Sequence, residues 1–242
     1  MVVKDMGLAL KAVFTDWYNT IFVKDKKNGK YAKFIMAGLV VFAIGWGAYY
    51  AYNYFIFRRE SAAQKIFNEC LREFENVEKG DGSWYDVQVA FQMGYKQHAS
   101  SKLAPYFLAY KAEALNNDGK KKEAIETLGQ ALEKMNKSAG MFSMYKTKLA
   151  LMKLDMKDDP VLQKEGLQEL EAIACVGTAD KACEESSGNH SALYYLGLYH
   201  WEKNDIQMAK NIWQKLVAMQ VDKEGMASGY IASAREKLSQ ID

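Results

Sequence analysis

The chain of 242 residues is poor in the residues that interrupt or cross-link a fold. It has only 2 prolines and 17 glycines, too few for a β-sandwich or barrel, in which turn signals recur about every 8–12 residues. Its three cysteines, Cys70, Cys175 and Cys183, are too few for a disulfide scaffold and lack the paired CxxC spacing of a zinc site. The composition therefore favours a helical, globular fold, and we expect no bound metal.

The sequence also lacks a strong excess of either charge. Lys and Arg number 32 and Asp and Glu number 30, a formal net charge of +2, so no basic surface covers the whole chain as nucleic-acid binding would require. The three histidines show no HExxH spacing, and neither a GxSxG nor a GxxxxGK[ST] motif occurs. We therefore expect a protein that is not an enzyme, has no cofactor and binds no nucleic acid.

One segment departs from a soluble composition. The 24 residues from Phe34 to Phe57 carry no charge, whereas about 20 apolar residues suffice for a helix to cross the roughly 30 Å hydrocarbon core of a bilayer. Tyrosines flank both ends, as in the aromatic belts of membrane proteins. A buried core helix is the alternative. The run begins 33 residues into the chain and no small-x-small site follows it, so we predict an uncleaved signal-anchor at 34–57 rather than a signal peptide.

The charges around this segment indicate its orientation. Five lysines lie in the 20 residues before Phe34, and four Lys or Arg residues lie in the 20 residues after Phe57. Residues 1–33 sum to +4 and the rest of the chain to −2, so the positive-inside rule places the basic arm in the cytoplasm and the larger part across the membrane. Apolar residues between Leu10 and Ile21 recur at helical spacing, which makes the arm amphipathic. It either docks onto a membrane partner or serves as a passive anchor.

Residues 58–242 show helical periodicity throughout, so we predict an all-α fold. Asp159 before Pro160 is typical of a capped helix start. We expect Cys70 to face the core together with Ile66 and Phe74. The expected helices are Glu60–Val77, Tyr85–His98, one pair within Leu103–Met135, another within Met141–Ala174, a third within Ser191–Met219, and a last helix at Met226–Gln240.

Two stretches, Leu108–Asn136 and Leu193–Met219, repeat one order of residues: a small residue, a turn residue, an alanine and a large apolar residue. Those residues are Ala112, Gly119, Ala124 and Leu128 in the first stretch and Gly197, Asn204, Ala209 and Trp213 in the second. Small residues permit close contact between paired helices, while bulky ones fill the gap to the next pair. Met141–Ala174 fits less well, with Gly166 at the tight position. The pattern resembles tetratricopeptide repeats and predicts an α-solenoid; the alternative is an unrelated helical bundle.

The whole layout resembles a known family. A basic tail and a span with the cluster Gly45-Trp46-Gly47 and Tyr49-Tyr50 precede divergent repeats. This is similar to the family of the ancillary subunit of the bacterial Sec translocon, whose repeats are shared with a cell-division coordinator. The resemblance implies a single-pass inner-membrane protein with its bulk in the periplasm, and Sec translocon subunits, periplasmic chaperones or unfolded clients as partners. The chain departs from the family in its long loop at 175–190 and in its repeat spacing of 42 and 43 residues.

The predicted organisation has four parts. They are a cytoplasmic arm (1–33), a transmembrane helix (34–57), a helical extension with entry helices (58–102) and the repeats with a terminal capping helix (103–242). We expect a membrane-anchored protein–protein interaction module that links the translocon to chaperones or holds emerging clients. A structural scaffold or assembly adaptor of another envelope complex, in cell division or outer-membrane assembly, is the alternative.

A repeat solenoid binds through the face lined by its first helices. The expected groove residues are Tyr106, Ala109, Glu113 and Asn116 in the earlier repeat and Tyr194, Leu198 and Trp201 in the last. They lack the Lys, Arg and Asn set that clamps a terminal carboxylate, so the groove favours extended apolar or amphipathic segments. Alternatively, these aromatics pack on the terminal helix. Cys175 and Cys183 either form a disulfide across their loop or remain free thiols in a reducing compartment.

Overall fold

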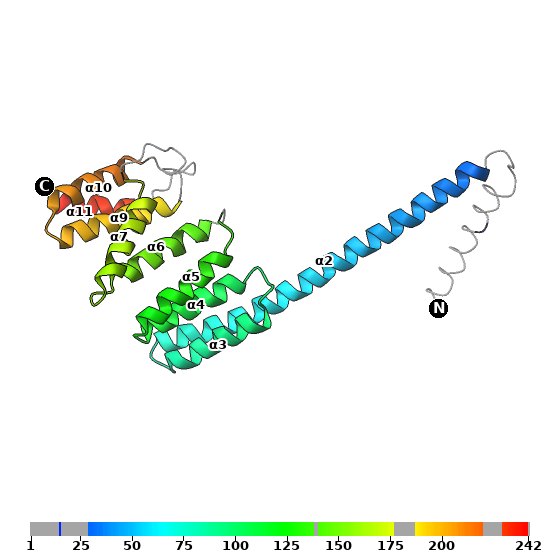
Figure 1. Ribbon diagram of the computed structural model, residues 1–242, viewed down its shortest axis with the longest axis horizontal. Coiled ribbons are helices and arrows are strands. Elements are labelled where there is room, and N and C mark those ends of the chain that lie inside the picture. The colour runs from blue at the N-terminus through cyan, green and yellow to red at the C-terminus, as the bar shows by residue number, and fades with distance from the viewer. Residues whose placement is uncertain (1–14, 16–28, 138–139, 177–186, 220–228, 242) are drawn as a thin grey trace. The chain divides into compact units, whose positions relative to one another are not determined.

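The computed structural model describes residues 15, 29–137, 140–176, 187–219 and 229–241. Within these ranges all regular secondary structure is helical and no strand occurs, which confirms the all-α class for that part of the chain (Figure 1). The helices are α2 (Gly29–Glu78), α3 (Trp84–Gln97), α4 (Ala104–Asn117), α5 (Lys121–Lys134), α6 (Gly140–Leu154), α7 (Pro160–Ile173), α9 (Ser187–Glu202), α10 (Ile206–Ala218) and α11 (Gly229–Ser239).

The chain divides into two units, Met1–Arg59 and Glu60–Asp242. Of the described helices, only α2 is long and apolar enough to cross a membrane, and no part of its apolar window is buried by the protein. Phe42 and Trp46 are each 64% exposed and Phe55 is 74% exposed. This exposure disagrees with the alternative of a core helix, which would cover such side chains.

The last turns of α2 belong to the second unit, where they pack against α3 and α4. Phe67 lies edge-on to Phe91 and Phe107, with ring centroids 6.0 and 5.0 Å apart, a favourable geometry for aromatic pairs. Cys70 is buried in this cluster with Phe74, as predicted. Burial, reinforced by nearby glutamates, raises the pKa of the Cys70 thiol to about 11, so this cysteine is an inert core residue at neutral pH.

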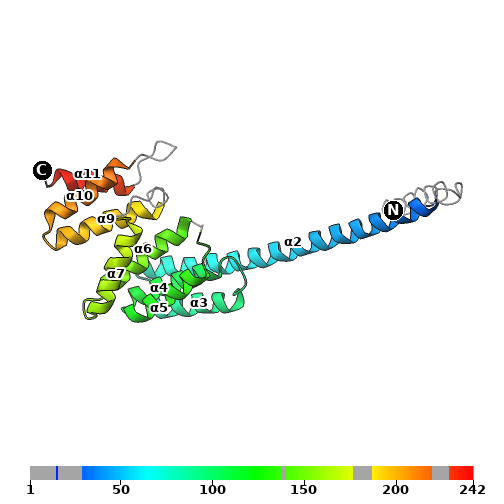
Figure 2. The same ribbon diagram turned by 45° about the horizontal axis from the view of Figure 1, so that its top comes forward.

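The following helices form three consecutive antiparallel pairs, α4 with α5, α6 with α7, and α9 with α10 (Figure 2). Neighbouring pairs contact each other through α5 with α6 and through α6 and α7 with α9, while α11 packs on α9 and α10. The predicted turn residues Gly119 and Asn204 join the helices of the first and third pairs. Both adopt left-handed backbone conformations, with φ of 79° and 62°, which Gly and Asn tolerate best.

Small residues lie where the paired helices touch, as the sequence predicts. Ala112, Ala124 and Ala209 are at most 1% exposed. A Cβ atom on Gly166 would lie 2.6 Å from the Ala150 carbonyl oxygen, and one on Gly197 would lie 2.3 Å from Trp213 Nε1. The backbones of α6 and α7 therefore approach so closely that only glycine fits at position 166.

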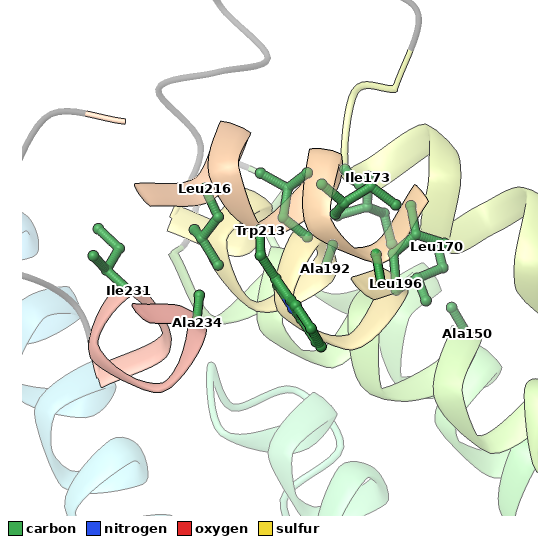
Figure 3. Packing of buried hydrophobic residues seen from close by; sticks show 13 residues of the cluster. Ala150, Leu170, Ile173, Ala192, Leu196, Trp213, Leu216, Ile231 and Ala234 are labelled. Atoms are coloured by element: carbon green, nitrogen blue, oxygen red, sulfur yellow. The ribbon is translucent and has the colours of Figure 1, made fainter. Parts of the chain in front are cut away.

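The C-terminal core is built around Trp213 (Figure 3). Its indole is fully buried among side chains of α7, α9 and α11, and its Nε1 donates a hydrogen bond to the Tyr194 carbonyl oxygen at 3.2 Å. Trp213 is thus a bulky filler between helices, the role that the repeat pattern gives it. The labelled neighbours in Figure 3 are Ala150, Leu170, Ile173, Ala192, Leu196, Leu216, Ile231 and Ala234.

Most helix boundaries agree with the sequence. Asp159 accepts a hydrogen bond from the Leu162 amide, with Pro160 as the first helical residue, so the predicted cap is confirmed. The loop expected to reach residue 190 is shorter at that end, because α9 begins at Ser187 rather than Ser191. Asn189 is completely buried, which indicates that packing extends the helix beyond its sequence propensity. Residues 10–21, which give the arm its amphipathic pattern, lie outside the described residues except for Thr15.

Candidate protein-binding site

A surface cleft of about 500 Å³ opens between α4, α6, α9 and α11. We call it the tyrosine cleft, because tyrosines come from each of these four helices. Its lining residues are Tyr110, Glu113, Asn116, Met141, Met144, Tyr145, Thr147, Lys148, Leu151, Met152, Asp155, Ser191, Tyr195 and Tyr230. The residues are far apart in the sequence, and the stacking of consecutive helix pairs assembles them.

Three tyrosines of this cleft, Tyr110, Tyr145 and Tyr195, have pKa values raised above the ordinary value and are neutral at physiological pH. Burial raises the pKa of Tyr110 above its ordinary value, and the negative charges of Glu113 and Glu78 add to the effect. Burial likewise raises the pKa of Tyr145, and that of Tyr195, where Tyr230 contributes as well. These three phenols therefore stay protonated. They offer ring faces and hydroxyl hydrogen bonds to a ligand rather than a negative charge.

The charged groups of the tyrosine cleft are paired. Lys148 Nζ lies 2.6 Å from Glu113 Oε1, which joins α6 to α4 across the cleft. Asp155 Oδ2 lies 2.5 Å from Lys121 Nζ of α5. Both carboxylates are thus neutralised within the protein, and the cleft presents an aromatic and apolar surface with little net charge.

Two methionines contribute the exposed apolar part of the cleft. Met141 is 42% exposed and Met144 is 44% exposed, both on α6. Unbranched, polarisable methionine side chains adapt to differently shaped partners, and tyrosines supply rigid amphipathic contact area. Such a surface suits the recognition of protein segments.

A second cleft, of about 710 Å³, lies between α6, α7 and α9. We call it the lysine cleft. Its lining residues are Leu151, Leu154, Asp155, Lys157, Pro160, Gln163, Lys164, Leu167, Tyr195, Leu198, Tyr199, Glu202 and Lys203. Leu151, Asp155 and Tyr195 line both clefts, so the two clefts adjoin at these residues.

The seven groove residues expected from the sequence do not form a single strip. Glu113 and Asn116 line the tyrosine cleft. Leu198 lines the lysine cleft. Ala109 of α4 is only 2% exposed and lies in the buried cluster that α4 forms with α5 and α6. A ligand cannot reach it there.

The three expected aromatic residues mainly serve packing. The Tyr106 ring lies 6.2 Å from that of Tyr145, and Tyr194 packs between the rings of Tyr195 and Tyr230. Trp201 contacts the Trp213 ring at 5.1 Å and has Lys237 Nζ of α11 4.3 Å above its own ring. For Tyr194 and Trp201 this arrangement corresponds to the alternative of packing against the terminal helix.

Sequence reasoning missed most of the tyrosine cleft. The largest contribution comes from α6, whose segment matches the repeat pattern less well and was assigned no groove residues. Tyr195 was passed over in favour of its neighbour Tyr194, because helical spacing alone does not fix the rotation of α9. Treating α6 as the middle first helix, equivalent to α4 and α9, would have directed attention to Met141, Met144 and Lys148.

The remaining candidate chemistry is limited in the part of the chain that the structure describes. Cys175 is disulfide-bonded, and Lys215 Nζ donates a hydrogen bond to its carbonyl oxygen at 3.0 Å. Cys183 lies outside the described residues, so its pairing with Cys175 stays a prediction. Among the described side chains, no group of three or more His, Cys, Asp or Glu residues is placed to hold a metal ion.

Comparison with known proteins found no family model that matches the chain and no matching relative among curated proteins. The chain's own residues and geometry must therefore support any functional proposal.

Proposed function

We propose that the protein is a membrane-anchored interaction module that binds segments of other proteins in the tyrosine cleft. The observation that carries the proposal is the cleft itself, an aromatic and apolar surface with little net charge on α4, α6, α9 and α11. Tyrosines and methionines are enriched in the centres of protein interfaces, where charged residues are depleted. The paired charges of Glu113 and Lys148 fit a binding surface better than an acid–base centre, because each neutralises the other.

We infer further that the three helix pairs are divergent tetratricopeptide-like repeats. The small residues at the helix contacts and the left-handed turn residues Gly119 and Asn204 support this interpretation. In such an array α4, α6 and α9 are the first helices of successive repeats, and their shared face is the binding face. The tyrosine cleft lies along these three helices.

The proposed location is the bacterial inner membrane. The apolar run at 34–57 anchors the chain, the basic arm faces the cytoplasm, and residues 60–242 face the periplasm. Lysines before the span support this orientation. The resemblance to the translocon-associated family then favours a place beside the secretion channel, where the module holds emerging clients or recruits chaperones without catalysing a reaction.

Photocrosslinking in living cells tests this function. A benzophenone amino acid replaces Met144, which is 44% exposed and lines the tyrosine cleft. The control position is Met208 of α10, which is 42% exposed and lines neither cleft. We expect adducts with translocon subunits, chaperones or secreted proteins from position 144 and none of these from position 208.

Two outcomes would contradict the proposal. Equal crosslinking from both positions would mean that the tyrosine cleft is not the preferred contact. Adducts with a single division or assembly protein, which also co-purifies at a fixed ratio in mild detergent, would indicate the structural scaffold instead. Clients of a holding module would vary in identity and amount.

A further inference from the structure

The lysine cleft differs from the adjoining tyrosine cleft in charge. Three lysines, Lys157, Lys164 and Lys203, lie along it, against the carboxylates of Asp155 and Glu202. Asp155 is already paired with Lys121, so three cationic groups face one carboxylate that has no ion pair elsewhere among the described residues. The rim of this cleft is therefore locally cationic.

This local excess contrasts with the net charge of the unit as a whole. Residues 60–242 contain 23 Lys and Arg residues and 27 Asp and Glu residues, a net charge of −4. Lys153 of α6, outside the cleft, lies close to two carboxylates of α7, with Nζ 3.5 Å from Glu165 Oε2 and 2.6 Å from Glu169 Oε1. Within the described residues, Lys157 and Lys164 have no such ion pair. Lys203 Nζ lies 5.8 Å from the ring centre of Tyr199, a weak and exposed contact.

The floor between these lysines is apolar. Leu151 and Leu154 of α6, Leu167 of α7 and Leu198 of α9 line it, and all four are only partly buried. An apolar floor with a cationic rim is complementary to a segment that has apolar side chains on one face and carboxylates beside them. Because Leu151 and Tyr195 belong to both clefts, the clefts are close enough for one bound segment to contact both.

We propose that the lysine cleft makes the protein select acidic amphipathic protein segments, whose carboxylates meet Lys157, Lys164 and Lys203 while their apolar side chains occupy the floor. This inference rests on the proposed function, since the acidic segment is the same segment that binds in the tyrosine cleft. The inference adds to that function the chemical character of the partner. The tyrosine cleft contributes affinity for any apolar segment, and the lysine cleft distinguishes acidic segments from neutral ones.

Fluorescence anisotropy with the full chain in phosphatidylcholine nanodiscs tests the selection. Two labelled amphipathic peptides share the same leucine and tyrosine positions and carry either Glu or Gln at the remaining positions. We expect the Glu peptide to bind about tenfold more tightly at low salt, because three exposed ion pairs each contribute modestly. High salt should remove most of that difference.

Variants separate the two clefts. Replacing the three lysines together (K157Q, K164Q, K203Q) should abolish the preference for the Glu peptide and leave the affinity for the Gln peptide unchanged. K146Q is the matched control, since Lys146 is an exposed lysine of α6 that lines neither cleft; it should change neither affinity. Met144→Glu in the tyrosine cleft should weaken binding of both peptides.

The outcomes distinguish this inference from the proposed function. If both peptides bind equally, or if the triple variant keeps the preference, the acidic selection is wrong while peptide binding stands. If neither peptide binds, or if Met144→Glu changes nothing, the proposed function itself fails. If phosphatidylglycerol vesicles bind the wild-type chain but not the triple variant, and excess Glu peptide does not displace them, the lysines belong to lipid headgroups instead and the inference is overturned.

Discussion

Tyr145 lines the tyrosine cleft with only 4% of its surface exposed. Its ring contributes to the wall, and burial raises the pKa of its hydroxyl group above the ordinary value of about 10. The neutral phenol is therefore part of what holds the cleft together. A charge on this side chain would have to be accommodated in an apolar surrounding, which is unfavourable.

This pKa shift predicts how stability depends on pH. Because the pKa of Tyr145 is higher in the folded than in the unfolded chain, the unfolded chain loses this proton first as the pH rises. The free energy of unfolding should then fall above about pH 10, as the unfolded tyrosine ionises, and keep falling until the folded pKa is reached. Tyr145→Phe should lessen that fall, measured by urea unfolding at a series of alkaline pH values.

Tyr85→Phe is the matched control, since Tyr85 is 61% exposed and lines neither cleft. It should leave the alkaline loss of stability unchanged. Phenolate absorbance should also show that one late-ionising tyrosine is missing only in the Tyr145→Phe variant. An identical alkaline profile for both variants would contradict the assigned burial of Tyr145.

Helix contacts depend on single small residues, of which Gly166 is the clearest case. An added Cβ would meet the Ala150 carbonyl oxygen at 2.6 Å and the Leu154 amide nitrogen at 2.7 Å, and backbone atoms cannot move aside as a flexible side chain can. Gly166→Ala should therefore lower the free energy of unfolding by about 1–3 kcal/mol by forcing α6 and α7 apart. Thermal unfolding of the full chain in detergent, followed by circular dichroism, measures this loss.

Gly129→Ala on α5 is the control for the change in helix propensity. A Cβ at position 129 would meet nothing within 4 Å, so this substitution should be neutral or stabilise by about 0.5–1 kcal/mol. Equal effects of the two substitutions would show that α6 and α7 are not in such close contact.

The helices could be predicted from the sequence because their signals are local. Asp159 and Pro160 mark the start of α7, and Gly119 and Asn204 mark the turns, each by the conformational preference of one or two residues. The start of α9 at Ser187 rather than Ser191 was not predicted, and Asn189 within this added turn is completely buried. Where tertiary packing decides at which residue a helix begins, the neighbouring sequence carries no signal for that boundary.

The candidate site was less predictable than the helices. Helical spacing indicates which residues share a face, but the rotation of each helix in the array decides which face is open. Of the expected groove residues, Glu113 and Asn116 line the tyrosine cleft, whereas Trp201 lies against Trp213 and Lys237. The low net charge of the tyrosine cleft arises from pairing across helices, such as Lys148 with Glu113, which no single segment encodes.

The two units of the chain differ in the environment, lipid or water, that their surfaces favour. The unit Met1–Arg59 contains the exposed apolar stretch of α2, whereas the unit Glu60–Asp242 buries its apolar side chains in three clusters. An exposed run such as Phe42, Trp46 and Phe55 is unfavourable in water and favourable in lipid. The second unit has a core of its own, so an aqueous compartment suits it on whichever side of the membrane it lies.

Protease accessibility decides which side that is. With an epitope on each terminus, protease added outside intact bacterial spheroplasts should remove the C-terminal epitope and spare the N-terminal one. The reason is that the lysine-rich residues 1–33 resist translocation, while the long unit after the span crosses with little regard to its charge. Osmotic lysis should expose both epitopes. If the C-terminal epitope survives in intact spheroplasts while a periplasmic marker is digested, the tyrosine cleft faces the cytoplasm and cannot receive exported segments.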